Sequence, residues 1–429
     1  MIARDLSEPV WFRRSGRVAA GAMAAAWVVI LVLILRHRIF TSSDTVSNYA
    51  HVWYVSKILV ASHRIPFHMP VIGHGRGLAF PYGFIPWLFA AVLRPWLGDW
   101  AVTLALVIGS IGAVLATFTA FPELRRSWWI ALVLANPVLI GAVLLGQLPF
   151  VWAIAMFLGA VACWRTGSTG WAIVLAGLGQ ATHVAVVLPI AAIVVAGWLR
   201  WESDRRRLLC AYAASLVIAL PAVPLVFMTP AYTDSALGVK VANLIGTVAP
   251  RLLVVVIPVL LVLISRVSRP WMPPILLVVL IAITAALATQ ADNRHAWGDL
   301  EKSPERTLLP YLASSAFRPG LEYRVLSTTD RRIGMYQVIQ HGGTLDSEFF
   351  PESLVRRTWP DALQYCRFLK AREVDRVIVY DEYDLRLRKN EQKLLSLLSL
   401  HDRDGCTAAG VAVRLVTKEK LFEVYAITR

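Results

Sequence analysis

Acidic residues are scarce in the first two thirds of this 429-residue chain. Only eight of its 28 aspartates and glutamates lie before residue 290, whereas its 43 lysines and arginines divide almost evenly about that point. The basic excess therefore lies in the first part, in loops between apolar runs. Because such loops face anionic lipid, the pI of about 10.0 indicates a membrane surface and not nucleic acid as the partner.

Charge is also missing from the middle of the apolar runs. Hydrophobic residues make up 57% of the chain and the mean hydropathy is +0.58, which excludes an ordinary soluble domain. Runs long enough to cross about 30 Å of hydrocarbon recur up to Thr289 and then stop. None carries Asp, Glu, Lys or Arg at mid-membrane, so the sequence offers no ion pathway of the kind that a transporter or flippase needs.

We therefore predict a polytopic α-helical membrane protein with about nine transmembrane helices and a C-terminal α/β domain outside the membrane. The predicted spans are 18–35, 101–121, 128–145, 148–164, 170–182, 183–199, 208–227, 250–265 and 271–289. The first is interpreted as an uncleaved signal anchor. The apolar stretch 78–93 is short and contains Pro81 and Pro86, and we interpret it as a juxtamembrane helix.

The short loops fix the predicted orientation. With this set of spans every short loop that carries arginine lies on the side of the N-terminus, as the positive-inside rule requires. The N-terminus is then cytoplasmic, and the loop 36–100 and the tail are extracytoplasmic. We expect a multi-pass protein of the plasma (inner) membrane.

Two interruptions are expected within the spans. Pro137 follows Asn136 inside the third span and predicts a kink. The run 170–199 is longer than one helix needs, and we interpret it as two short helices meeting at the outer surface with His183 at the break. A histidine that is simply satisfied between helices is the alternative.

The tail has the alternating pattern of an α/β domain. Tyr323–Thr328 and Arg376–Tyr380 are rich in strand formers, 360–372 and 388–400 are helical in pattern, and Val411–Val416 with Phe422–Ile427 indicate a closing hairpin. The expected organisation is a membrane domain 1–289, which includes the loop 36–100, then a linker 290–322 and a soluble domain 323–429.

Four cysteines divide between these regions. Cys163 and Cys210 lie in or beside spans, where packing is the expected role. Cys366 and Cys406 lie in the tail, where an oxidising location lets a disulfide persist. The spacing alone does not show that these two meet, so their pairing is left open.

One carboxylate stands out in the loop after the first span. Asp44 and Asp99 are the only acidic residues between Arg36 and Trp100, in a stretch rich in histidine and arginine. A single base can deprotonate an acceptor hydroxyl while a phosphate departs as an anion that needs no acid. The alternative for Asp44 is a helix cap or a solvated loop residue, and a helix cap is the expected role of Asp99.

Other polar residues are candidates for binding the substrate. They are His51, His74, Arg76, Gln147, His183 and Arg251. Arg251 starts the predicted eighth span, where a guanidinium can bind a lipid phosphate through two hydrogen bonds. Ordinary snorkelling to lipid headgroups is the alternative for this residue.

The layout resembles the GT-C superfamily of polyprenyl-phosphate-sugar-dependent integral membrane glycosyltransferases. The resemblance is carried by Thr41-Ser42-Ser43-Asp44, Phe80-Pro81-Tyr82-Gly83, Gly146-Gln147, Ala181-Thr182-His183 and the tail phrases Tyr323-Arg324-Val325-Leu326 and Val374–Val379. It implies that Asp44 is the catalytic base and that Gln147, His183 and Arg251 lie near the donor.

The resemblance also implies the reaction. A sugar passes from a polyprenyl phosphate donor to a lipid or glycan acceptor of the cell envelope on the outer membrane face. Many members carry a second acidic residue beside the first, where this chain has Val46 and Ser47, so a divalent metal is left open. The alternative is a non-catalytic GT-C-like envelope protein that binds a lipid or glycan partner.

Overall fold

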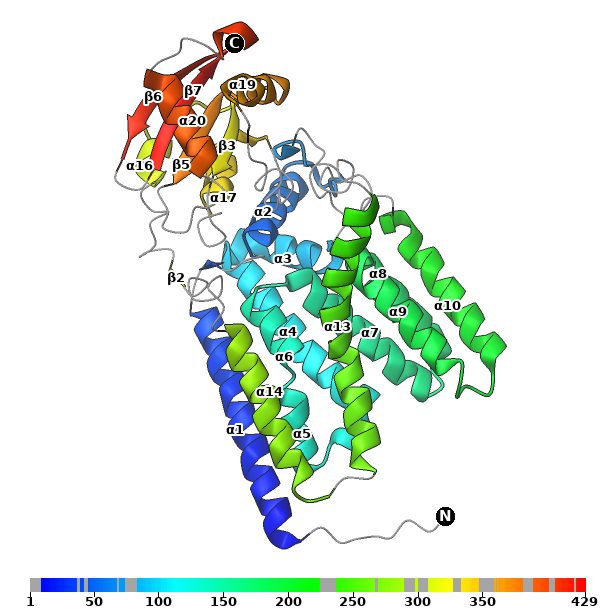
Figure 1. Ribbon diagram of the computed structural model, residues 1–429. Coiled ribbons are helices and arrows are strands. Elements are labelled where there is room, and N and C mark those ends of the chain that lie inside the picture. The colour runs from blue at the N-terminus through cyan, green and yellow to red at the C-terminus, as the bar shows by residue number, and fades with distance from the viewer. Residues whose placement is uncertain are drawn as a thin grey trace. The chain divides into compact units, whose positions relative to one another are not determined.

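A computed structural model of the chain divides into two compact units (Figure 1). The structure describes residues 9–36, 39–41, 45–67, 69–73, 83–223, 237–266, 269–288, 298–299, 308–326, 333–346, 359, 361–380, 389–400, 406–419 and 422–429. One unit comprises Met1–Arg38, Pro81–Val226 and Gly238–Arg294, and we call it the helical unit. The other comprises Ile39–Phe80, Phe227–Leu237 and His295–Arg429, and we call it the sheet unit.

The helical unit follows the apolar runs of the sequence. Its α-helices are α1 (Val10–Leu35), α3 (Phe84–Leu97), α4 (Trp100–Ala120), α5 (Ser127–Leu134), α6 (Pro137–Leu144), α7 (Leu148–Arg165), α8 (Thr169–Thr182), α9 (Val184–Trp198), α10 (Arg205–Ala219), α13 (Leu237–Ser265) and α14 (Met272–Ala288). Five stretches of the described residues are long and apolar enough to cross a membrane: Val10–Leu35, Trp100–Ala120, Ser127–Leu144, Leu148–Arg165 and Val248–Ser265. A polytopic helical membrane protein is confirmed, and the number of nine crossings stays a prediction.

Both expected interruptions are present. α5 ends at Leu134, and α6 begins at Pro137 with the Asn136 side chain accepting hydrogen bonds from Val138 N and Leu139 N. α8 ends at Thr182 and α9 begins at Val184, so His183 stands alone at the break. The kink at Pro137 and the break at His183 are therefore confirmed.

Glycines inside the helices let neighbouring helices approach closely. A Cβ at Gly177 of α8 would lie 2.6 Å from Cβ of Ile218 in α10, and one at Gly179 would lie 2.9 Å from the Ala153 carbonyl oxygen in α7. In lipid, no hydrophobic driving force holds helices together, so their association depends on van der Waals packing. Small residues at the contacts allow the backbones to come close enough for such packing. These glycines hold α8 against α7 and α10 without ending the helix.

The sheet unit contains a mixed five-stranded sheet. The strand order is β4 (Thr344–Leu345), β3 (Glu322–Leu326), β5 (Arg376–Tyr380), β7 (Phe422–Thr428) and β6 (Ala412–Lys418), with β4, β3 and β5 parallel and the pairs of β7 antiparallel. The α-helices in the C-terminal part of this unit are α16 (Leu308–Leu312), α17 (Ile333–Gln340), α19 (Ala362–Ala371) and α20 (Lys389–Leu400). The expected α/β tail with its closing hairpin is confirmed.

The segment Ile39–Phe80, which follows the first apolar helix, groups with the tail. α2 (Thr45–Ser62) packs against α17, with the rings of Tyr49 and Tyr336 6.0 Å apart. Ahead of α2, the short strand β1 (Phe40–Thr41) pairs antiparallel with β2 (Gly298–Asp299). Beyond α2, Leu345 N donates to the Val71 carbonyl at 2.9 Å. The sequence placed this loop with the membrane domain, because an apolar helix face does not reveal which partner covers it.

A disulfide and an ion cluster lie in the interior of the sheet unit. Cys366 and Cys406 are both buried and disulfide-bonded, with Cα atoms 5.2 Å apart. Arg324 of β3 is 2% exposed and donates to Asp346 at 2.9 Å and to Glu391 at 2.6 Å. Burial opposes the positive charge, but Glu391 and Asp346 raise the pKa of Arg324 above its ordinary value.

Candidate functional site

Phe150 is the residue around which the candidate site of the helical unit is built. Its ring is 1% exposed. The imidazole of His183 meets it edge-on, with ring centroids 5.9 Å apart and an interplanar angle of 82°. The guanidinium carbon of Arg251 lies 5.7 Å from the same ring centroid. Gln147 is buried one turn before Phe150, at the N-cap of α7.

A glycine turn sets the position of Gln147 and Phe150. Gly146 has φ of +67°, a conformation that side-chain-bearing residues rarely adopt. The turn is closed by Gly146 N donating to the Val143 carbonyl at 3.1 Å and Gln147 N donating to the Ala142 carbonyl at 2.9 Å. α7 can therefore start shortly after α6, with Gln147 at its N-cap.

The break at His183 is tied to the start of α3. Gly83 N donates to the Thr182 carbonyl at 3.0 Å, and Gly83 has φ of +67°. A Cβ at Gly83 would lie 3.0 Å from Cγ of Pro149. The first turns of α3 and α7 and the break before α9 are therefore in contact.

This contact has an electrostatic consequence. The N-terminus of a helix carries a partial positive charge and favours anions. α3, α7 and α9 contain 14, 18 and 15 residues, long enough for developed dipoles. Three positive helix ends therefore meet beside the Arg251 guanidinium, and the arrangement suits a phosphate.

Arg251 lies further inside its helix than the sequence indicated. α13 already begins at Leu237, so Arg251 is not its first residue, although it lies near the start of the apolar stretch Val248–Ser265. α13 is linked to the start of α6, where Asn136 Nδ2 donates to the Val254 carbonyl at 3.4 Å. The guanidinium of Arg251 stacks on buried Phe150 and therefore points toward α7. Snorkelling to lipid headgroups alone does not require this direction.

The remaining candidates are distributed differently. His51 belongs to α2 of the sheet unit, is buried, and its Nδ1 donates to the Ser47 carbonyl at 2.7 Å. Asp44, His74 and Arg76 lie outside the described residues. No group of three or more potential metal ligands occurs among the residues that the structure describes.

Asp99 does not act as the expected cap. It occupies the N-cap position of α4, but its side chain makes no capping hydrogen bond. Its carboxylate instead pairs with Arg94 Nη2 at 3.1 Å. The cation five residues earlier in the chain competes successfully with the backbone N–H groups, since a charged partner gives the stronger hydrogen bond.

Sequence reasoning missed the central role of Phe150. An aromatic residue one turn after Gly146-Gln147 was the available signal, but an apolar residue in an apolar span does not stand out. The meeting of three helix ends depends on contacts between segments far apart in the chain, which no local pattern contains.

No protein-family model matches this sequence, and no curated protein matches it. Among solved structures the chain is similar to ArnT from Cupriavidus metallidurans, in crystal structures bound to undecaprenyl phosphate and in the apo state. The sequence identities are 13% and 15%, with a TM-score of 0.44 in both cases, over 94% of this chain and 97% of the other.

Proposed function

We propose that this chain is a membrane glycosyltransferase that transfers a sugar from a polyprenyl phosphate to a lipid or glycan of the cell envelope. The observation that supports the proposal is the cluster of Arg251, His183 and Phe150 where three helix N-termini meet. In a chain of such apolar composition, an anionic group held there belongs to a lipid-linked substrate more readily than to a soluble one.

Asp44 is the proposed catalytic base. Its carboxylate takes the proton of an acceptor hydroxyl, and the acceptor oxygen forms a bond to the anomeric carbon. The bond from that carbon to the phosphate oxygen breaks, and its electron pair leaves with the phosphate. Positive helix ends and Arg251 stabilise the negative charge of the departing phosphate.

No step is assigned to a metal ion. A pair of carboxylates separated by one residue would place the second at Val46, which is apolar and 1% exposed.

The reaction is proposed for the outer membrane face. The arginine-bearing short loops support a cytoplasmic N-terminus, and the disulfide of Cys366 and Cys406 supports an oxidising location for the tail. Cysteine labelling tests this in a background with Cys163 and Cys210 replaced by serine. In intact cells an impermeant reagent should label Ser303→Cys and not Ser203→Cys, and the reverse result overturns the proposed orientation.

The decisive experiment measures transfer and donor binding separately. Asp44→Asn should lower transfer by roughly 10²- to 10⁴-fold, because the amide keeps size but cannot accept the proton. Donor binding should survive, since the phosphate is held by Arg251. Asp99→Asn is the control, because it changes a second carboxylate whose partner is the half-buried Arg94, and equal loss in both variants indicates a folding defect. Full transfer by Asp44→Asn excludes Asp44 as the base.

Arg251→Met should instead weaken binding of the polyprenyl phosphate itself. A hydrogen bond to a charged group contributes about 1.5–3 kcal/mol, which corresponds to roughly 10- to 150-fold in affinity. Arg251→Lys should recover part of the loss, and Arg266→Gln just beyond the other end of α13 should have no effect. Unchanged binding by Arg251→Met removes Arg251 from the donor site, and a wild-type chain without transfer activity favours the non-catalytic alternative.

A further inference from the structure

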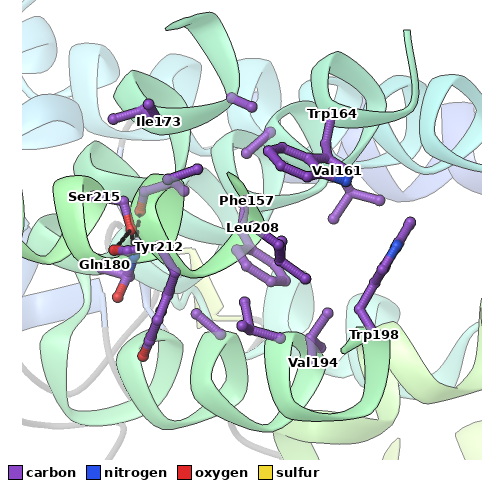
Figure 2. A pocket seen from close by; sticks show the side chains of 16 residues that line it. Phe157, Val161, Trp164, Ile173, Gln180, Val194, Trp198, Leu208, Tyr212 and Ser215 are labelled. Carbon is purple, nitrogen blue, oxygen red and sulfur yellow. Dashed lines mark hydrogen bonds between the residues drawn. The ribbon is translucent and has the colours of Figure 1, made fainter. Parts of the chain in front are cut away.

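A groove runs between α7, α8, α9 and α10 of the helical unit (Figure 2). It encloses a cavity of about 70 Å³. Almost all of its wall is apolar, with Phe157, Val161, Val194 and Leu208 facing the cavity. Ile173 and Val195 also line it and are partly exposed, so it opens to the surroundings of the helices.

The two ends of the groove differ. At one end Gln180 donates through Nε2 to Ser215 Oγ at 3.0 Å, which joins α8 to α10. At the other end stand the indole rings of Trp164 and Trp198, at the C-terminal ends of α7 and α9. Tryptophans are enriched at the level of lipid headgroups, so the Trp end marks the membrane–water boundary.

A basic loop contacts the Trp end directly. The guanidinium of Arg207 lies 5.2 Å from the ring of Trp164, and the indole N–H of Trp164 donates to Glu202 at 3.0 Å. Arg200 of the same loop is exposed, and so are Arg205 and Arg206 in the first turn of α10. Cations therefore stand where a lipid whose chain fills the groove would place its headgroup.

We propose that the groove holds a short segment of one acyl chain of an anionic glycerophospholipid, with the lipid phosphate against Arg200, Arg205 and Arg206. The apolar wall takes a few methylene groups next to the headgroup, and the arginines select the headgroup by charge. Each arginine close to an anionic membrane surface raises the affinity about fivefold.

This site is separate from the proposed donor site. His183 stands at the start of α9, whereas Trp198 is its last residue. The 15 residues of α9 span roughly 22 Å, so the two phosphate positions lie near opposite faces of the membrane. The groove lipid belongs to the leaflet on the side of the basic loop, and its binding does not depend on the proposed transferase activity.

Native mass spectrometry of the purified full-length protein with defined lipids tests the proposal. Dioleoyl phosphatidylglycerol should be retained as one tightly bound molecule, and dioleoyl phosphatidylcholine should bind at least tenfold more weakly. The double variant Arg205→Gln, Arg206→Gln should weaken phosphatidylglycerol binding about 25-fold, from two arginines at about fivefold each. Arg13→Gln, Arg14→Gln removes the same charge at α1 and should leave this binding unchanged.

A groove-filling variant tests the position of the chain. Val194→Trp places a large ring in the cavity and should abolish tight retention. Ile193→Trp is its matched control, because Ile193 adjoins Val194 on α9, is 49% exposed and does not line the groove. Equal binding of the two lipids, equal loss in both tryptophan variants, or competition by polyprenyl phosphate at similar affinity overturns the proposal. If Val194→Trp does not fold, the arginine variants still decide.

Discussion

The helical unit and the sheet unit bury polar groups in different ways. The sheet unit encloses a charged cluster, in which Arg324 is held between the carboxylates of Asp346 and Glu391. In the described spans of the helical unit the buried polar side chains are neutral, and most bond within their own helix. Ser110 Oγ donates to the Leu106 carbonyl at 2.6 Å, and Thr117 Oγ1 donates to the Ala113 carbonyl at 2.8 Å.

The difference follows from the solvent of each unit. The hydrocarbon layer contains no water to solvate a charge, so charged side chains are rare there. For the same reason, short hydroxyl side chains donate hydrogen bonds to the nearest backbone carbonyl. A charge cluster in a water-soluble domain balances desolvation against close pairing, and removal of one member leaves the others buried without compensation. Mutations should therefore cost much more in the sheet unit than at comparable positions in the helical unit.

The largest effect is expected at Arg324. Arg324→Ala leaves Asp346 and Glu391 buried without their cation and should destabilise the sheet unit by about 3–5 kcal/mol. Pulse proteolysis of the full-length protein over a urea series measures the change. Replacement of all three residues by apolar residues of similar size should restore most of the stability. A loss below about 0.5 kcal/mol for Arg324→Ala would contradict the comparison.

The disulfide should have a slightly smaller effect on the same unit. Cys366→Ser with Cys406→Ser opens a loop with a sequence separation of 40 residues, and loop-closure entropy assigns about 3–4 kcal/mol to it. Thiol alkylation of denatured, non-reduced protein should modify only Cys163 and Cys210. Alkylation of all four cysteines without reductant would show that the bond does not form.

The smallest effect is expected in the helical unit. Ser215→Ala removes the acceptor of Gln180 Nε2, and a side-chain hydrogen bond between membrane helices contributes about 0.6 kcal/mol on average and at most about 1.7. A double-mutant cycle with Gln180→Leu in mixed detergent micelles isolates this energy. A coupling as large as the Arg324 effect would remove the contrast between the units.

The sequence predicted the elements better than their partners. Hydropathy located the helices of the membrane part, because each apolar run has to be long enough to cross lipid. Strand-forming residues located β3, β5 and the β6–β7 hairpin within a few residues. The break at His183 was also predictable, because one run was too long for a single helix.

Contacts between distant segments could not be predicted in this way. The guanidinium of Arg324 lies over the ring of Phe368 in α19, and the carboxylates that balance its charge come from Asp346, just after β4, and from Glu391 of α20. Likewise, Phe150 lies in an unremarkable apolar run until Arg251, about 100 positions later, stacks on its ring. The residues next to Arg324 and Phe150 in the sequence do not indicate which distant residues contact them.

The pairing of β1 with β2 has a consequence for how the protein is made. Roughly 250 residues separate the two strands, so β1 and α2 leave the ribosome long before the partners that cover them. At about 5–20 residues per second, they wait on the order of 10–50 seconds for β2 and α17 to be synthesised. A premature stop after the last membrane helix would leave every apolar run in place. It would still deprive β1 of its paired strand β2 and α2 of the helix α17 that packs against it.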